Sequence, residues 1–369
     1  MKGKSGRKLR SAYRSFKEWF AETPLQIFPF RSYLKGYSRE TAKFDLKASV
    51  NVALLAIPQG MAYAAIAELP ILYGIICSAV ASIVAPLFAS SRQTILGPTN
   101  ATSLMVFSFF AAQGLAMEEK LALMPLLVLM VGIICLIGAL LKAADLLQYI
   151  SQSVLVGYIT GAAILIMINQ GKHLFGVADT VQSASNFFGM LDGLLTVSSS
   201  FLWQPALLGG ATLLIYFVIS RFLPTLPNFA LTLFLVALGS AIAANFLPGW
   251  SETVPNFKAY ALNDLQPKFP TASENGIFHD ISTLMSVALA IAFLASLENT
   301  VMSKSIASRT GQRAEINQDM LSVGMANIAC AFTAAMPASG SLTRSALNYE
   351  SKARTGLASL LCGFFCLIA

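Results

Sequence analysis

The residues with the clearest chemical potential lie between Met336 and Ser345, where Met-Pro-Ala-Ser-Gly-Ser-Leu-Thr-Arg-Ser places a fixed positive charge in an apolar stretch. The proline and glycine of this run predict an extended or turned backbone, after which a helix can begin. The first N–H groups of a helix have no partner within it and carry partial positive charge. Together with the hydroxyls of Ser341 and Thr343 and the guanidinium of Arg344, they form a candidate site for an anion.

A second stretch, Gln93 to Leu104, repeats this pattern, because Gly97-Pro98 leads into a polar helix start at Thr99 or Asn100. Two half-helices that begin near the middle of a bilayer are typical of transporters built from inverted repeats, in which substrate lies between opposed helix ends. The alternative is that both stretches only kink full-length spans, since Gly and Pro are common in membrane helices. The hydroxyls beside each breaker favour the half-helices.

Gln59 and Tyr63 are the next candidates, in the run Pro-Gln-Gly-Met-Ala-Tyr. They are four residues apart and share a helix face, so they can offer an amide and a phenol to one ligand. The alternative is an interhelical hydrogen bond from Gln59 and ordinary aromatic packing by Tyr63.

Glu298 is the only acidic residue of its predicted span. Three roles are open to it: accepting a proton or neutralising a cation that travels with the anion, pairing with Arg344, or lying at the interface near the end of the span. Arg344 likewise either lines a cavity or extends to the interface beside Lys352 and Arg354.

The composition identifies a polytopic membrane protein. Of the 369 residues 56% are hydrophobic and 12% are charged, and the mean hydropathy is +0.66. Soluble domains carry about twice this charged fraction. No cofactor or metal site is expected, because His173 and His279 lack a second ligand at metal spacing. The spans also show no Ser/His, paired-Asp or metal-ligand arrangement, so an enzyme is not predicted.

Positive charge is concentrated at the start of the chain. Residues 1–47 hold 12 Lys and Arg against 4 Asp and Glu, a net charge of +8 within the overall +7. We interpret residues 1–45 as a basic cytoplasmic arm that sets topology or contacts anionic lipid, with no role in binding nucleic acid. The predicted location is the plasma membrane, crossed several times, with a cytoplasmic N-terminus.

Runs of roughly 20 apolar residues predict the spans. The first repeat, residues 46–247, holds seven, and a connecting loop at 248–280, placed outside, precedes a second repeat at 281–369. The last run is too short to cross, so we expect the chain to be truncated within the second repeat. The predicted spans are Leu46–Ala67, Ile71–Ala89, Gln93–Gln113, Leu121–Leu141, Ser151–Asn169, Phe201–Phe222, Phe229–Phe246, Ile281–Val301, Ala314–Ala335, Met336–Tyr349 and Gly356–Ala369.

The distribution of basic residues agrees with this path. Beyond the arm, eight basic residues fall on the predicted cytoplasmic side and four outside, as the positive-inside rule requires. Seven spans separate the first from the eighth and the third from the tenth, and an odd offset reverses orientation, as in an inverted repeat. The inner residues are Arg92, Lys142, Arg221, Lys304, Arg309, Arg313, Lys352 and Arg354, and the outer ones are Lys120, Lys172, Lys258 and Lys268.

Several of these motifs resemble the sulfate permease family, whose animal branch includes the solute carrier 26 anion exchangers. The resemblance covers about Phe44 to the end of the chain. Its most specific part is Ile57-Pro58-Gln59-Gly60-Met61-Ala62-Tyr63-Ala64 with Leu69-Pro70-Ile71-Leu72-Tyr73-Gly74-Ile75. The others, in order, are Gly97-Pro98-Thr99, Ser296-Leu297-Glu298-Asn299, Asn317-Gln318-Asp319, Gly324-Met325-Ala326-Asn327 and Ser339 to Ser345.

The resemblance implies an all-α fold of seven plus seven inverted-repeat spans, divided into core and gate domains. It also implies a homodimer and a following cytosolic STAS domain. The anion would lie between the third and tenth elements, near Gln59, Tyr63, Thr99, Thr343 and Arg344. Glu298 matches the eighth-span acid of bacterial and plant members, which is associated with proton or sodium coupling.

We therefore expect a secondary active transporter that moves a small inorganic anion of the sulfate, bicarbonate or chloride class by alternating access. One alternative is a nucleobase:cation symporter of similar fold, which suits Glu298 but not Arg344. Another is an anion channel that uses the same site.

Overall fold

The structure is a computed structural model. Most of the predicted arm at 1–45, of the fifth span at 151–169 and of the loop at 248–280 lies outside the residues that it describes. The described residues are 25–26, 28–31, 36–147, 149, 203–222, 228–247, 249–250, 269–270, 276–311 and 313–368, with isolated positions between 153 and 171.

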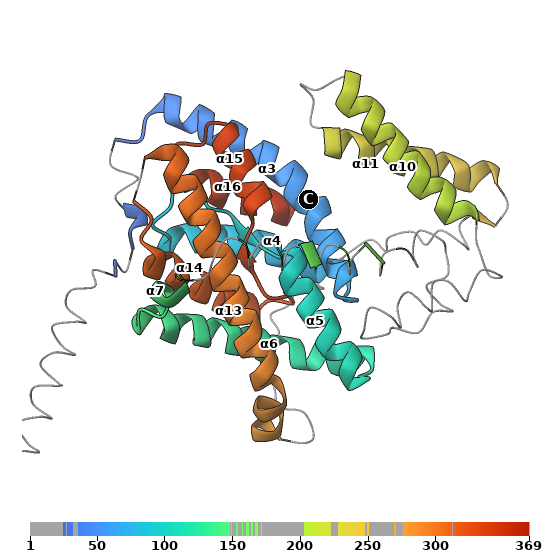
Figure 1. Cartoon of the computed structure of the whole chain (residues 1–369). Coiled ribbons are helices and arrows are strands. Elements are labelled where there is room, and N and C mark those ends of the chain that lie inside the picture. Colours follow the sequence, from blue (N-terminus) through green and yellow to red (C-terminus); the bar gives the residue numbers. More distant parts are fainter. Residues whose placement is uncertain are drawn as a thin grey trace, which may run out of the picture.

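Within these ranges the fold is almost entirely helical (Figure 1). Five of the helices are long and apolar enough to cross a membrane, which confirms the prediction of a polytopic membrane protein. They are α3 (Arg39–Ile66), α4 (Ile71–Phe88), α6 (Met117–Leu140), α10 (Trp203–Phe222) and α13 (Ile277–Thr310).

The predicted third and tenth spans are both broken, as expected. The first consists of strand β1 (Leu96–Gly97) and helix α5 (Asn100–Gln113), and the second of strand β2 (Ser339–Gly340) and helix α15 (Leu342–Glu350). The two strands pair antiparallel, with Leu96 opposite Gly340 and Gly97 opposite Ser339. Because the two strands run in opposite directions, helices α5 and α15 leave this short strand pair from its opposite ends.

The long helices agree with the predicted spans in position, but the boundaries of two of them differ clearly. Helix α3 begins at Arg39, before the predicted Leu46. Helix α13 continues to Thr310, whereas the sequence predicted an end at Val301. The prediction ended the span at Val301 because polar residues follow, although the helix continues through them. The other helices are α7 (Ala144–Leu147), α11 (Asn228–Phe246), α14 (Ile316–Ala331) and α16 (Leu357–Ile368).

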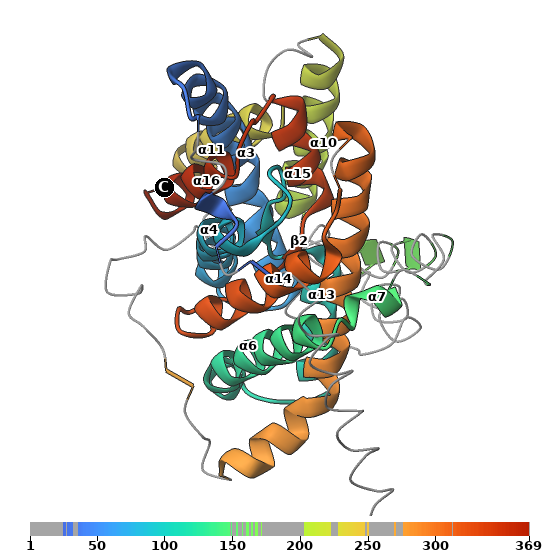
Figure 2. The same ribbon diagram turned by 90° about the vertical axis from the view of Figure 1, so that its left-hand side faces the viewer.

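The helix packing follows the expected repeat symmetry. Helix α4 packs against α16 and helix α14 packs against α6, so the second span meets the eleventh as the ninth meets the fourth (Figure 2). Glycines permit the close crossing of α14 and α6, since a Cβ on Gly324 would lie 3.0 Å from the carbonyl oxygen of Gly132. Helices α10 and α11 pack together, and α11 also touches α3.

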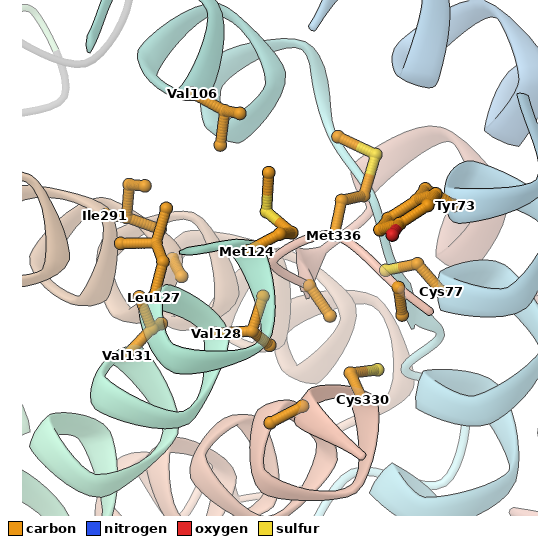
Figure 3. Close-up of a cluster of buried hydrophobic side chains, with 14 of the residues drawn as sticks. Tyr73, Cys77, Val106, Met124, Leu127, Val128, Val131, Ile291, Cys330 and Met336 are labelled. Carbon is orange, nitrogen blue, oxygen red and sulfur yellow. The ribbon is translucent and has the colours of Figure 1, made fainter. Parts of the chain in front are cut away.

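The largest apolar cluster lies where α4, α5, α6, α13 and α14 meet (Figure 3). Met124 and Leu127 of α6 and Ile291 of α13 are fully buried in it. Met336 and Ala338, which precede β2, belong to the same cluster. The core therefore supports the irregular segment that leads into α15.

Loops assigned by charge to one side of the membrane meet at one end of the bundle. Buried Asp319 of α14 accepts from the backbone N–H of Ser90 at 2.8 Å, and Asn317 donates to Asp145 at 3.1 Å. Buried Asp45 of α3 accepts from the N–H groups of Arg354 and Thr355, at 2.7 and 3.1 Å. These contacts join segments from the first half of the sequence to segments from the second.

Candidate anion-binding site

The site begins at the two capped helix starts. The side chain of Thr99 accepts from the N–H of Thr102 at the start of α5, and the side chain of Ser341 accepts from the N–H of Arg344 at the start of α15. Each cap satisfies one of the N–H groups that lack a carbonyl within the helix. The earlier N–H groups of both helices remain available as donors, and both helix dipoles are positive at this point.

Arg344 lies in the first turn of α15 and is fully buried. Its Nε donates to Oε1 of Gln59 at 3.0 Å, and its Nη1 donates to Oγ of Ser78 at 3.2 Å. Its Cζ lies 5.9 Å from the ring centre of Tyr63. Among the described residues its Nη2 has no hydrogen-bond partner. The guanidinium therefore points into the bundle, and the alternative in which it extends to the interface is wrong.

Small residues make room for this guanidinium. A Cβ on Gly97 would lie 2.2 Å from Nη1 of Arg344, so no other residue type fits beside it without displacement. Gly60 and Gly74 allow α3 and α4 to cross closely, because a Cβ on Gly60 would lie 2.7 Å from the carbonyl oxygen of Gly74. This crossing brings Gln59 and Ser78 to the same cation.

Glu298 of α13 is held by hydroxyl groups at the strand pair and at the start of α5. Its Oε2 accepts from Oγ1 of Thr99 at 2.9 Å and from Oγ of Ser339 at 2.6 Å. It lies well inside α13, which continues to Thr310, so its placement at the end of a span is wrong. In the described part of the chain it makes no ion pair with Arg344, and that alternative is wrong as well.

The other predicted residues differ in their contacts and in their exposure. Gln59 donates from Nε2 to Oγ1 of Thr343 at 3.4 Å, so its amide joins Thr343 to Arg344. Thr343 itself is exposed, and Tyr63 is half-buried. Asn100 is exposed in the first turn of α5.

Sequence reasoning missed the polar residues that hold the strands. Asn327 of α14, to which we assigned no role, accepts from the N–H of Ala338 at 2.8 Å and donates to its carbonyl at 2.9 Å. The side-chain oxygen of Ser345 accepts from the N–H of Ile95 at 2.9 Å, and the hydroxyl of Ser82 donates to the carbonyl of Leu96 at 3.0 Å. A polar residue among small apolar ones was the only signal that could have identified them.

The arrangement concentrates positive potential in one place. Two helix starts and one arginine meet there, and in the described chain the guanidinium is held by neutral oxygen atoms without an ion pair. The positive charge of such a guanidinium is not neutralised by a carboxylate, so it can attract an anionic ligand. Its unpartnered Nη2 also needs a hydrogen-bond acceptor. A small oxyanion or halide supplies that acceptor and complements the helix dipoles.

Paired half-helices in an inverted repeat define this chain as a membrane protein with a secondary-transporter fold. The sequence profile of the Sulfate permease family matches residues 43–369. The chain belongs to this family, and the predicted membership is confirmed.

Two curated relatives illustrate the similarity. The chain is 31% identical over 344 residues to the chloroplastic sulfate transporter 4.1 of Arabidopsis thaliana, covering 91% of this chain and 49% of the relative. It is 28% identical over 330 residues to the probable sulfate transporter Rv1739c of Mycobacterium tuberculosis, covering 89% and 57%. The chain thus spans about half the length of the curated relatives it matches. Both relatives are described as transporters, not enzymes.

Solved structures show the same fold. The transmembrane domain of the cyanobacterial bicarbonate transporter BicA matches with a TM-score of 0.74 at 20% identity, covering 90% of this chain and 83% of that one. The murine anion transporter Slc26a9 in its inward-facing state matches with a TM-score of 0.79 at 18% identity, covering 93% and 58%. These matches confirm the predicted inverted-repeat transporter fold.

Proposed function

We propose that this chain carries the anion-binding site of a secondary active transporter for small inorganic anions, of the sulfate, bicarbonate or chloride class. The single observation that carries the proposal is Arg344, fully buried at a helix start and held only by uncharged acceptors. A buried arginine without a carboxylate partner is costly unless a ligand compensates it. Gln59, Tyr63, Thr99, Asn100, Ser341 and Thr343 are the other proposed contacts.

The names of the relatives support the choice of substrates to test. Sulfate appears in the descriptions of the plant and mycobacterial relatives, and bicarbonate in that of the cyanobacterial structure. Sulfate is the first substrate to test, because sulfate transporters are the relatives with the higher sequence identity. Bicarbonate and chloride follow.

Glu298 is our candidate for coupling. Its carboxylate receives hydroxyl hydrogen bonds from Thr99, which caps α5, and from Ser339 of β2. A change in the charge of Glu298 is therefore transmitted to both half-helices through single hydrogen bonds. This arrangement suits a proton or sodium ion that moves together with the anion.

The mechanism that we propose is alternating access. The described elements around the strand pair belong to a core domain that carries the anion and moves against a gate domain. We propose a homodimer in the plasma membrane with the N-terminus in the cytoplasm, and two repeats at 46–247 and 281–369 joined by an extracellular loop. The basic arm at 1–45 supports this orientation.

The test is uptake of labelled anions by the purified protein in proteoliposomes, with pH and sodium gradients imposed separately. We expect saturable sulfate uptake that an excess of unlabelled anion suppresses and that one of the two gradients stimulates. Absence of saturable uptake of sulfate, bicarbonate and chloride would overturn the proposal.

The same preparation tests the alternatives. Suppression of labelled sulfate uptake by uracil or xanthine would favour a nucleobase symporter, which the uncompensated charge of Arg344 disfavours. Anion conductance in a planar bilayer without countertransport would favour a channel. For a transporter we expect neither result.

A further inference from the structure

Serine 78 is the one contact of the Arg344 guanidinium that neither the motifs nor the proposed ligand contacts include. Ser78 lies on α4 and is fully buried. Its hydroxyl lies 3.5 Å from the carbonyl oxygen of Ala56, to which it donates. Because its hydrogen is directed to Ala56, its lone pairs are free to accept from Nη1 of Arg344 at 3.2 Å.

The guanidinium has three nitrogens, and the protein occupies two of them. Nε is bound to Gln59 and Nη1 to Ser78, while Nη2 has no partner among the described residues. The planar group is fixed by two acceptors on two different helices, α3 and α4. It therefore cannot rotate about its last bonds without breaking one of these contacts.

We infer that Ser78 is a positioning residue: with Gln59 it fixes the plane of the Arg344 guanidinium so that Nη2, the nitrogen without a partner among the described residues, is presented to the anion. This inference rests on the proposed function. An arginine held in this way binds Gln59 through its single Nε N–H and Ser78 through one N–H of Nη1, and it keeps both N–H groups of Nη2 for its ligand. The helix starts of α5 and α15 then supply the remaining donors.

The local packing leaves little space around the Ser78 side chain. A Cβ on Gly60 would lie 2.7 Å from the Ser78 oxygen, and a Cβ on Gly97 would lie 2.2 Å from Nη1 of Arg344. Two glycines thus leave room for one small acceptor and the cation that it holds. Alanine fits the same space as serine and removes the hydroxyl, with its 3.2 Å contact to Arg344 and its longer 3.5 Å contact to Ala56, so Ser78→Ala is the variant to test.

The first test compares the concentration dependence of sulfate uptake in proteoliposomes. Loss of a hydrogen bond to a charged group raises KM in Ser78→Ala by about ten- to hundredfold, with Vmax within about twofold of wild type. The matched control is Ser359→Ala on α16, because Ser359 is equally buried and donates to the carbonyl of Ser82 at 3.0 Å without touching Arg344. An unchanged KM in Ser78→Ala would overturn the inference.

A double-mutant cycle separates positioning from a merely structural role. In an Arg344→Lys background the guanidinium is absent, so Ser78→Ala changes KM by less than about twofold if it acts through Arg344. An equal effect in both backgrounds would show that Ser78 acts on the fold instead. The melting temperatures of all variants are measured in parallel.

A second measurement does not depend on transport. Phenylglyoxal modifies free guanidinium groups, and mass spectrometry of the peptide that contains Arg344 gives the rate at this residue. We expect a severalfold faster modification in Ser78→Ala and an unchanged rate in Ser359→Ala. If the wild-type protein takes up no anion, the proposed function fails, but the modification rate still tests the role of Ser78. Equal rates in wild type and Ser78→Ala would refute the positioning role of Ser78.

Discussion

Arg344 and Gln59 lie 285 positions apart in the chain, yet Nε of the first donates to Oε1 of the second at 3.0 Å. One residue comes from the tenth predicted span and the other from the first. The strand pair joins the same two halves, since β1 precedes α5 and β2 precedes α15. The candidate site therefore combines residues from both halves of the sequence, and neither half contains all of them.

The contact between these residues predicts the effect of adding a negative charge. Gln59→Glu places a carboxylate beside Nε of Arg344. This carboxylate neutralises the positive charge that we propose attracts the anion. We expect anion uptake to fall by about tenfold or more while the protein remains folded, because the new ion pair competes with the ligand. Uptake in proteoliposomes and the melting temperature in detergent measure the two effects.

Asn51→Asp is the matched control for this charge change. Asn51 lies on the same helix and donates to Oγ of Ser351 at 3.2 Å, away from Arg344. Its replacement makes the same amide-to-carboxylate change, and we expect uptake within about twofold of wild type. Equal losses in both variants would mean that negative charge on α3 is harmful wherever it lies.

Removal of the cation itself gives the second prediction. Arg344→Ala leaves the Gln59 and Ser78 oxygens without their donor and takes away the fixed charge. Truncation of one partner of a buried charged contact costs about 2 kcal/mol or more, so we expect uptake to fall by about thirtyfold or more. Arg309→Ala, at an exposed position in the last turn of α13, should leave uptake unchanged. Normal uptake by Arg344→Ala would remove this residue from the site.

A backbone position provides the third prediction. In Gly97→Ala the new methyl group would lie 2.2 Å from Nη1 of Arg344, so the guanidinium or β1 must move. Overpacking of this kind costs about 1–3 kcal/mol, and we expect both a lower melting temperature and loss of uptake. Gly239→Ala on α11 is the control, since its Cβ would meet no atom within 4 Å. Wild-type uptake by Gly97→Ala would show that the contact is not needed.

The sequence predicted the broken elements because breakers and hydroxyls are local signals. Gly97-Pro98 and the segment before Ser341 precede helix starts, and the caps formed by Thr99 and Ser341 follow the usual residue preferences. The spans themselves follow from the length of apolar runs. Both the breakers and the apolar runs are local patterns, which can be recognised in a short stretch of sequence.

The contacts between distant elements were not available from the sequence. Gln59 and Tyr63 share a face, but no local pattern gives the partner of that face, and Ser78 is one of several serines in apolar runs. In the sequence Asn327 is likewise an isolated polar residue, and only the structure shows that it binds Ala338. The sequence also left open a pairing of Glu298 with Arg344, which the structure does not show, because Thr99 and Ser339 supply Glu298 with hydroxyl donors.

The fourth prediction concerns coupling. Glu298→Gln cannot take up or release a proton, yet its carbonyl oxygen can still accept from Thr99 and Ser339. If protons drive transport through Glu298, the variant loses the stimulation by a pH gradient while anion exchange continues. Glu315→Gln, at an exposed position before α14, is the control and should keep the wild-type response. An unchanged pH dependence in Glu298→Gln would exclude this residue as the proton carrier.

The fifth prediction tests how the segment before β2 is held. Asn327→Ala removes both side-chain bonds to Ala338, whose N–H and carbonyl are then buried without partners. Each unsatisfied buried group costs about 1–3 kcal/mol, so we expect the variant to lose about 2–5 kcal/mol of stability. The control is Asn245→Ala on α11, because Asn245 is exposed and, within the described residues, donates to the carbonyl of Ala241, one turn earlier. Thermal unfolding in detergent should show a clear decrease for Asn327→Ala alone, and equal melting temperatures would mean that the apolar core, without Asn327, fixes this segment.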